Sequence, residues 1–281
     1  MMKKGINRWA FPADMSLVEV FALAKCSGFD GVEVTMDLNG ELSPDTTDEE
    51  ALAIKTAAES SGISLYSLAA SVYWSVSLVA DDPAERNKAK EYVKKQLHLA
   101  KILGCKTILA IPGHTGVDFA PNLGIIDYSV AYERAVGSAK DLAPYAENDG
   151  IIIGMENVWN KFLLSPREMK EFLDEVDSRH VKCYFDVGNT MQCSYPTHWI
   201  SILKDRICAV HIKDFKCSIG NLDGFCGLLQ GDVDFIQVMN ALEDVGYDGW
   251  ITAEVSPGSA SLNEFIKKTS DSMDKILRKE L

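Results

Sequence analysis

Long apolar segments are missing from this sequence of 281 residues. No apolar run approaches the roughly 20 residues that a membrane-spanning helix requires, which argues against an integral membrane protein of the helical kind. The N-terminus reaches Arg8, Trp9 and Pro12 too early to hold the apolar core of a signal peptide. We therefore expect a cytoplasmic protein without a membrane partner.

Basic side chains are scarce relative to acidic ones. The chain has 28 lysines and arginines against 41 aspartates and glutamates, a formal charge of −13. Nucleic-acid backbones select for basic surfaces, so we expect no nucleic-acid partner. A small anionic substrate stays possible, because it needs only a local group of basic side chains or helix N-termini.

Paired cysteine motifs are also absent. The seven cysteines are an odd number and form no C-x-x-C pair. Cys105, Cys183 and Cys208 lie in or beside apolar runs, where a reduced thiol packs as a small hydrophobic group. This pattern favours buried thiols in a reducing compartment. Cys217 and Cys226 lie in a predicted loop, where pairing or ligand binding stays open.

Apolar runs and helical patterns alternate along the whole chain, with no Pro-, Ser- or Gly-rich linker between them. About eight β/α units in roughly 250 residues match a (β/α)8 barrel. A doubly wound open sheet is the rival, but no G-x-G-x-x-G sequence follows a predicted strand. We predict an α/β fold, a single (β/α)8 TIM-barrel domain over residues 1–281. The expected strands are Lys4–Trp9, Gly31–Thr35, Ser64–Ala69, Thr107–Ile111, Ile151–Glu156, Val181–Asp186, Ile207–His211 and Trp250–Glu254.

Helix boundaries are marked by capping residues. Ser16 and Thr47 are expected N-caps, and Ser165 precedes a proline in the first turn of another helix. The longest helix is expected from about Pro83 to Leu103, ending at Gly104.

Charged side chains close the last four predicted strands: Glu156, Asp186, His211 and Glu254. Buried parallel strands exclude water from both faces, so a charge at their end is costly unless it is paired. In a barrel these ends meet at the C-terminal rim, where active sites are built. Three carboxylates and one imidazole form a ligand set for one divalent cation.

Each of these residues alone has an ordinary structural use. A single strand-end glutamate more often forms an ion pair or caps a helix, and an isolated buried histidine is more often a hydrogen-bonded core residue. Four such residues on successive strands favour a metal site instead.

The segments Asp186-Val187-Gly188-Asn189 and His211-Ile212-Lys213-Asp214, with Glu156 and Glu254, resemble the xylose-isomerase-like TIM barrels. Within this family of sugar isomerases and epimerases, the sequence is most similar to ketose 3-epimerases and L-xylulose/L-ribulose-5-phosphate 3-epimerases. The resemblance extends over nearly the whole chain. It implies that Glu156, Asp186, His211 and Glu254 bind one divalent ion. Mn²⁺ is the expected ion, with Mg²⁺, Co²⁺ or Zn²⁺ as alternatives.

The resemblance also implies a reaction, the C3 epimerisation of a ketose or ketose phosphate through a cis-enediolate. A divalent cation would stabilise the enediolate as a Lewis acid. Epimerisation removes a proton on one face and returns one on the other, which requires two opposed acid–base groups. By resemblance these catalytic groups are Glu156 and Glu254.

Further residues near strand ends are expected to contact substrate. Glu33 is expected to face the mouth or to pair with Arg8. Asn189 stands where related ketose epimerases often carry a substrate-binding histidine, which leaves the sugar preference open. The alternative for His114 is a solvated loop position, and the alternative for Trp9 is core packing. The expected contacts are Arg8, Trp9, Glu33, His114, Asn189 and Lys213.

Other functions stay open at this point. A dehydratase or an aldose–ketose isomerase would use the same ion and the same four ligands. An abasic-site endonuclease of this fold needs three zinc ions and about five histidines at strand ends, whereas only His211 is well placed among the five histidines. A non-catalytic sugar-binding barrel would not need a carboxylate pair. The resemblance also implies a dimer or tetramer.

Overall fold

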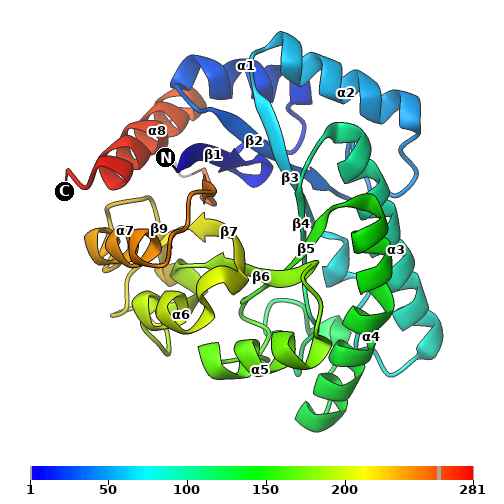
Figure 1. The fold of residues 1–281 in the computed structure, drawn as a ribbon. Coiled ribbons are helices and arrows are strands. Elements are labelled where there is room, and N and C mark those ends of the chain that lie inside the picture. Colours follow the sequence, from blue (N-terminus) through cyan, green and yellow to red (C-terminus); the bar gives the residue numbers. More distant parts are fainter. Residues whose placement is uncertain (1, 258–260, 281) are drawn as a thin grey trace.

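A ring of parallel strands surrounds the centre of the molecule in the computed structural model, which describes residues 2–257 and 261–280. Within these ranges eight strands close into a barrel in the order β1-β10-β7-β6-β5-β4-β3-β2, seen along its axis in Figure 1. The predicted (β/α)8 barrel is confirmed. Its strands are β1 (Lys3–Asn7), β2 (Gly31–Met36), β3 (Ser64–Ala70), β4 (Thr107–Ala110), β5 (Ile152–Glu156), β6 (Val181–Asp186), β7 (Ile207–Ile212) and β10 (Trp250–Ala253).

Helices cover the outside of the ring. The last helix packs against the first, so that these two helices close the outer layer side by side (Figure 1). No helix in the described ranges has both the length and the apolar character needed to cross a bilayer. The helices are α1 (Leu17–Ser27), α2 (Asp48–Ser60), α3 (Pro83–Leu103), α4 (Tyr128–Asp149), α5 (Pro166–Val176), α6 (Pro196–Leu203), α7 (Phe235–Asp244) and α8 (Leu262–Arg278).

The expected capping signals are confirmed. Ser16, Thr47 and Ser165 each accept a hydrogen bond from the third helical residue in a reciprocal capping box. Helix α3 ends at Gly104, whose φ of 83° is left-handed and suits glycine. These capping residues fix where each helix begins and ends. They thereby determine which residue of each strand lies at the rim.

Polar and aromatic side chains fill the interior of the barrel below the rim. The Tyr66 hydroxyl lies 2.8 Å from the Thr252 hydroxyl, and the Tyr66 ring stacks on Trp250 at 3.9 Å. A Cβ at Gly5 would clash with the Tyr66 hydroxyl, so only glycine fits there. The barrel is a packed core with its open end at the rim.

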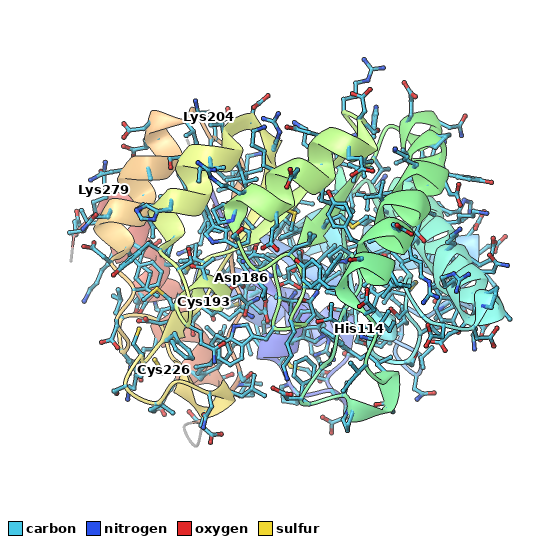
Figure 2. All side chains as sticks on the ribbon, turned by 90° about the horizontal axis from the view of Figure 1, so that it is seen from below. His114, Asp186, Cys193, Lys204, Cys226 and Lys279 are labelled. Atoms are coloured by element: carbon cyan, nitrogen blue, oxygen red, sulfur yellow. The ribbon has the colours of Figure 1, made fainter. Side chains whose placement is uncertain are left out.

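The C-terminal end of the barrel carries the longer loops. Figure 2 shows Asp186 inside the molecule, with His114, Cys193 and Cys226 toward one end and Lys204 and Lys279 at the other. Residues after β7 form a small hairpin of β8 (Asp214–Phe215) and β9 (Phe225–Cys226) at the mouth end. The buried Asp214 carboxylate accepts backbone hydrogen bonds from this loop, including those of Gln230 and Gly231.

Strand β1 is shorter than expected. It ends at Asn7, and a 3-10 turn over Arg8–Ala10 follows, because the Asn7 side chain accepts a hydrogen bond from the Trp9 amide. Arg8 and Trp9 therefore leave the strand direction, and their side chains do not follow the strand's alternation.

Candidate metal centre at the barrel mouth

Four strand ends bring three carboxylates and one imidazole together. Glu156 and Asp186 are the last residues of β5 and β6, His211 lies one residue before the end of β7, and Glu254 follows β10. One ligand atom from each lies within 4.8 Å of the others. Because β5, β6, β7 and β10 are consecutive neighbours in the barrel, these residues line one continuous part of the rim.

His211 is at the centre of this cluster. Its Nδ1 atom lies 2.7 Å from Glu254 Oε2, 3.8 Å from Glu156 Oε1 and 4.0 Å from Asp186 Oδ2. Asp186 and His211 are completely buried, and Glu156 is 5% exposed. Only Glu254 is more open, with its side chain 20% exposed, so the cluster is approached from the Glu254 side.

The pKa values of the three carboxyl groups in the cluster are shifted in different directions. Burial, with the neighbouring Glu254 and Glu156, raises the pKa of Asp186 to about 7 despite the opposing Lys213 charge. Burial also raises the pKa of Glu156. Glu254 differs, because the Lys213 ammonium and His211 outweigh its burial and hold its pKa at about 2. The cluster thus concentrates negative charge that needs a compensating cation.

Unpartnered atoms converge at the same point. Six buried side-chain atoms of the described residues lack a hydrogen-bond partner, and three of them, Asp186 Oδ2, His211 Nδ1 and Glu254 Oε2, belong to the cluster. His211 Nδ1 and Glu254 Oε2 are 2.7 Å apart, but they are not aligned as a hydrogen bond. Buried polar atoms are rarely left without partners. Their convergence, and their oxygen-rich chemistry with one imidazole nitrogen, fit a single divalent cation.

Lys213 is the cationic neighbour of the cluster. Its Nζ atom lies 2.7 Å from Glu254 Oε1 and 3.4 Å from Asp186 Oδ2, and it sits 5.2 Å from the centre of the Phe225 ring. Burial opposes its charge, but the carboxylates outweigh burial and raise its pKa above the ordinary value. Lys213 therefore lines the mouth as a permanent positive charge.

Glu33 lies beneath the cluster and does not contact Arg8. It is completely buried in β2. Its Oε2 atom is 2.7 Å from His211 Nε2, and it also accepts hydrogen bonds from Asn7 and the Tyr184 hydroxyl. Burial alone would raise its pKa, but these partners, His211 first, lower it. The structure thus places Glu33 behind His211, where it neither lines the mouth cavity nor forms an ion pair with Arg8.

Two asparagines join the ends of β5 and β6. The Asn157 side chain donates to the Asp186 carbonyl at 2.8 Å and accepts from the Asp186 amide at 2.7 Å. The Asn189 amide donates to Asp186 Oδ1 at 2.6 Å, and its side chain donates to the Asn157 carbonyl. Asn189 is 8% exposed at the mouth. Its hydrogen bond to Asp186 Oδ1 orients that carboxylate.

A cavity of about 380 Å³ opens above the cluster. Glu156, Glu254 and Lys213 form its charged side. Its remaining wall is mostly apolar and aromatic, and Trp74 meets Phe119 edge to face at 4.8 Å. A cavity with apolar walls and a few convergent polar groups is typical of a small-molecule site. The aromatic lining residues are Trp9, Trp74, Phe119, Trp159 and Phe225.

Two expected substrate contacts lie outside this cavity. The Arg8 guanidinium donates to the carbonyls of Phe11, Ala13 and Met15, and it lines a separate cavity of about 750 Å³. His114 is only 2% exposed and lines a small void together with Tyr73 and Trp74, so the alternative of a solvated loop histidine is wrong. Burial lowers its pKa.

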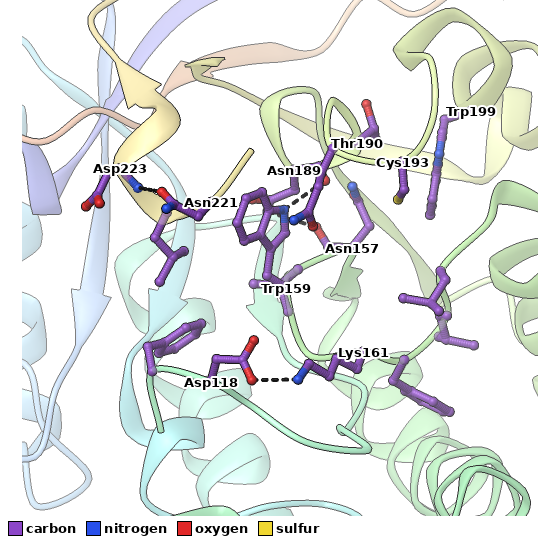
Figure 3. Close-up of a pocket in the computed structure, with 17 residues that line it drawn as sticks. Asp118, Asn157, Trp159, Lys161, Asn189, Thr190, Cys193, Trp199, Asn221 and Asp223 are labelled. Atoms are coloured by element: carbon purple, nitrogen blue, oxygen red, sulfur yellow. Dashed lines mark hydrogen bonds and ion pairs between the residues drawn. The ribbon is translucent and has the colours of Figure 1, made fainter. Parts of the chain in front are cut away.

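A neighbouring cavity of about 500 Å³ shares Trp159 and Asn189 with the mouth. Figure 3 shows these two residues in it, with the Lys161–Asp118 ion pair on one side and Trp199 and Cys193 on another. In the part of the chain that the structure describes, none of the four cluster residues lines it. Glu156 and Glu254 of the cluster therefore open to the mouth cavity and not to this neighbour.

The comparisons with known proteins agree with this geometry. Residues 21–276 match the family model described as the xylose isomerase-like TIM barrel. An uncharacterized protein of Methanocaldococcus jannaschii, MJ1311, is 25% identical over 175 residues, which span 60% of this chain and 57% of that protein. The putative L-ribulose-5-phosphate 3-epimerase SgbU of Escherichia coli K12 is 27% identical over 267 residues, 89% of this chain and 87% of that protein.

Solved structures share the fold over nearly the full length. The structure of an L-ribulose 3-epimerase superimposes with a TM-score of 0.81 and 17% identity, covering 99% of this chain and 95% of that chain. The family match extends over almost the whole sequence and includes all four strand ends of the cluster. This chain therefore belongs to the xylose isomerase-like TIM barrel family.

Proposed function

We propose that this protein is a divalent-metal-dependent sugar isomerase that epimerises a ketose or ketose phosphate at C3. The observation that carries the proposal is the convergence of three unpartnered buried atoms, from Asp186, His211 and Glu254, beside Glu156. These four residues would hold the ion. When bound, it would supply Lewis acidity that makes the proton beside a substrate ketone easier to remove.

Glu156 and Glu254 are proposed as the acid–base pair. They come from β5 and β10, on either side of β6 and β7, and both line the mouth cavity. One glutamate takes the C3 proton from one face of the substrate, and the other returns a proton to the opposite face. Lys213, at 2.7 Å from Glu254, would keep that carboxylate ionised and oriented.

The curated relatives make a five-carbon ketose the first substrate to test, and the solved structures named for D-psicose and D-tagatose add six-carbon ketoses to the same screen. SgbU is named for L-ribulose 5-phosphate and the superimposed structure for L-ribulose, and both names specify C3 epimerisation. We propose L-ribulose and its 5-phosphate as substrates and Mn²⁺ as the ion.

The decisive experiment is a turnover assay in D₂O. Metal-stripped protein is reloaded with Mn²⁺, Mg²⁺, Co²⁺ or Zn²⁺ and incubated with each ketose or ketose phosphate, and products are identified by NMR. Inverted C3 stereochemistry with deuterium at C3 supports the proposal.

Other products would identify the rival reactions. Deuterium at C2 of an aldose product indicates an aldose–ketose isomerase, and loss of water indicates a dehydratase. Sugar binding without any turnover by the metal-loaded protein would indicate a binding protein. Each of these results contradicts C3 epimerisation.

The remaining proposals concern the setting of the reaction. We propose that the protein acts in the cytoplasm on small sugars, without nucleic acid, as a dimer or tetramer. Cell fractionation and light scattering of the purified chain test these points.

A further inference from the structure

A completely buried carboxylate lies on the far side of His211 from the cluster. Glu33 Oε2 is 2.7 Å from His211 Nε2, whereas Nδ1 of the same ring is the atom nearest to Glu156, Asp186 and Glu254. The two ring nitrogens therefore face two different groups of carboxylates.

The partners of Glu33 fix where the proton of the ring must be. A carboxylate only accepts hydrogen bonds, so His211 Nε2 must carry a proton toward Glu33. Asn7 also donates to Oε2 of this carboxylate, and the Tyr184 hydroxyl donates to Oε1. In the neutral ring with its proton on Nε2, Nδ1 carries a lone pair. This lone pair faces the cluster and can bind a cation there.

We propose that Glu33 is a positioning residue for metal binding, which holds His211 in the Nε2-protonated form with Nδ1 directed at the ion. This inference rests on the proposed metal site. A carboxylate behind a ligating histidine fixes the ring orientation and increases its basicity, and its loss typically weakens metal affinity by about 10–100-fold.

Hydrogen bonds from several strands hold the Glu33 carboxylate in a fixed position, so that it can orient the His211 ring. Asn7, Glu33, Tyr184 and His211 come from β1, β2, β6 and β7, so hydrogen bonds from three other strands converge on one carboxylate. Gly154 makes room for this group, because a Cβ there would lie 2.8 Å from the Tyr184 ring. The carboxylate is therefore held from several sides and transmits a fixed orientation to His211.

The test measures metal affinity directly. Metal-stripped wild type, Glu33→Gln and Tyr66→Phe are titrated with Zn²⁺ and with Mn²⁺ against a competing chelator. Glu33→Gln keeps the side-chain volume but removes the charge that faces His211. Tyr66→Phe is the matched control, because it deletes a buried hydrogen bond in the barrel interior, to Thr252, that does not involve His211.

We expect Glu33→Gln to bind metal about 10–100-fold more weakly and Tyr66→Phe to bind like the wild type. A second readout is the ¹⁵N NMR spectrum of His211 in the Zn²⁺ form. In the wild type the proton is expected on Nε2 in a strong hydrogen bond, and its signal is expected to move in Glu33→Gln.

Three results would overturn the inference. The first is equal metal affinity in Glu33→Gln and wild type. The second is an equal loss in Tyr66→Phe, which would indicate general destabilisation. The third uses Glu33→Asp, which keeps the charge but shortens the reach: full affinity there would assign the effect to charge alone. If the wild type itself binds no divalent ion, the proposed function fails, and that result is distinct from these three.

Discussion

The two halves of the barrel mouth differ in their chemistry. The charged half, formed by β5, β6, β7 and β10, ends in Glu156, Asp186, His211 and Glu254. The aromatic half, formed by β1 to β4 and the turns after them, gives Trp9, Ala70, Trp74, Leu109 and Ile111 to the same cavity. Glu33, from β2 of that half, lies below the cavity against His211.

This difference separates reaction from recognition. The charged half offers atoms that bind a cation and move protons, whereas the aromatic half offers flat surfaces that suit the apolar face of a sugar ring or chain. Substitutions in the charged half are therefore expected to change kcat and metal affinity, and those in the aromatic half to change KM.

The largest effect is expected for Glu156→Gln and Glu254→Gln. Loss of a proton-transfer group is expected to reduce kcat by about 10²–10⁴-fold, and loss of a ligand also weakens metal binding. Steady-state kinetics at saturating metal measure the first effect. Glu91→Gln, an exposed residue of α3, is the control. Near-normal kcat in both mouth variants would contradict the division between the halves.

Metal affinity is expected to depend strongly on pH. The pKa of Asp186 is raised to about 7 by burial and the neighbouring carboxylates, so this ligand holds a proton below that pH. Metal must displace the proton, and affinity should rise by up to about tenfold per pH unit as the pH approaches 7 from below. Chelator competition between pH 5.5 and 8 measures this. A flat profile would show that proton release is not linked to binding.

In the aromatic half, Trp74→Ala is expected to act on substrate binding. Loss of an aromatic contact costs about 0.5–1.5 kcal/mol, so KM should rise by a factor of a few to about ten, with kcat and metal affinity little changed. Trp74→Phe, which keeps a ring, should lose less. A fall in kcat without a change in KM would assign Trp74 to the reaction itself.

The smallest catalytic effect is expected for Arg8→Lys. The guanidinium is engaged with three backbone carbonyls outside the mouth cavity, so KM should hardly change. The free energy of unfolding should fall by about 1–2 kcal/mol as these hydrogen bonds are lost, which urea titration measures. A large rise in KM would place Arg8 in substrate recognition after all.

The barrel and its four strand-end residues could be predicted from the sequence. Apolar runs, glycine stops and caps such as Ser16 and Thr47 mark each β/α unit, and residues that close parallel strands must meet at one rim. The convergence of Glu156, Asp186, His211 and Glu254 follows from that rule alone. No knowledge of side-chain detail was required.

The depth of individual side chains could not be predicted in the same way. Glu33 lies inside β2 and points inward, but how far below the rim it lies depends on the stagger between strands, which a single sequence does not give. Arg8 leaves the mouth because the Asn7 side chain ends β1 early. Asn157 and Asn189 pair across two strands, a contact that no local pattern marks.

The contact between Glu33 and His211 has a consequence for the assembly of the chain. All four cluster residues lie after Gly150, whereas Glu33 and Asn7 lie in the first forty residues. A fragment that begins near Gly150 would carry the whole ligand set without the carboxylate that orients its imidazole. Such a fragment would bind metal about 10–100-fold more weakly than the whole chain, and addition of the N-terminal half would restore the affinity.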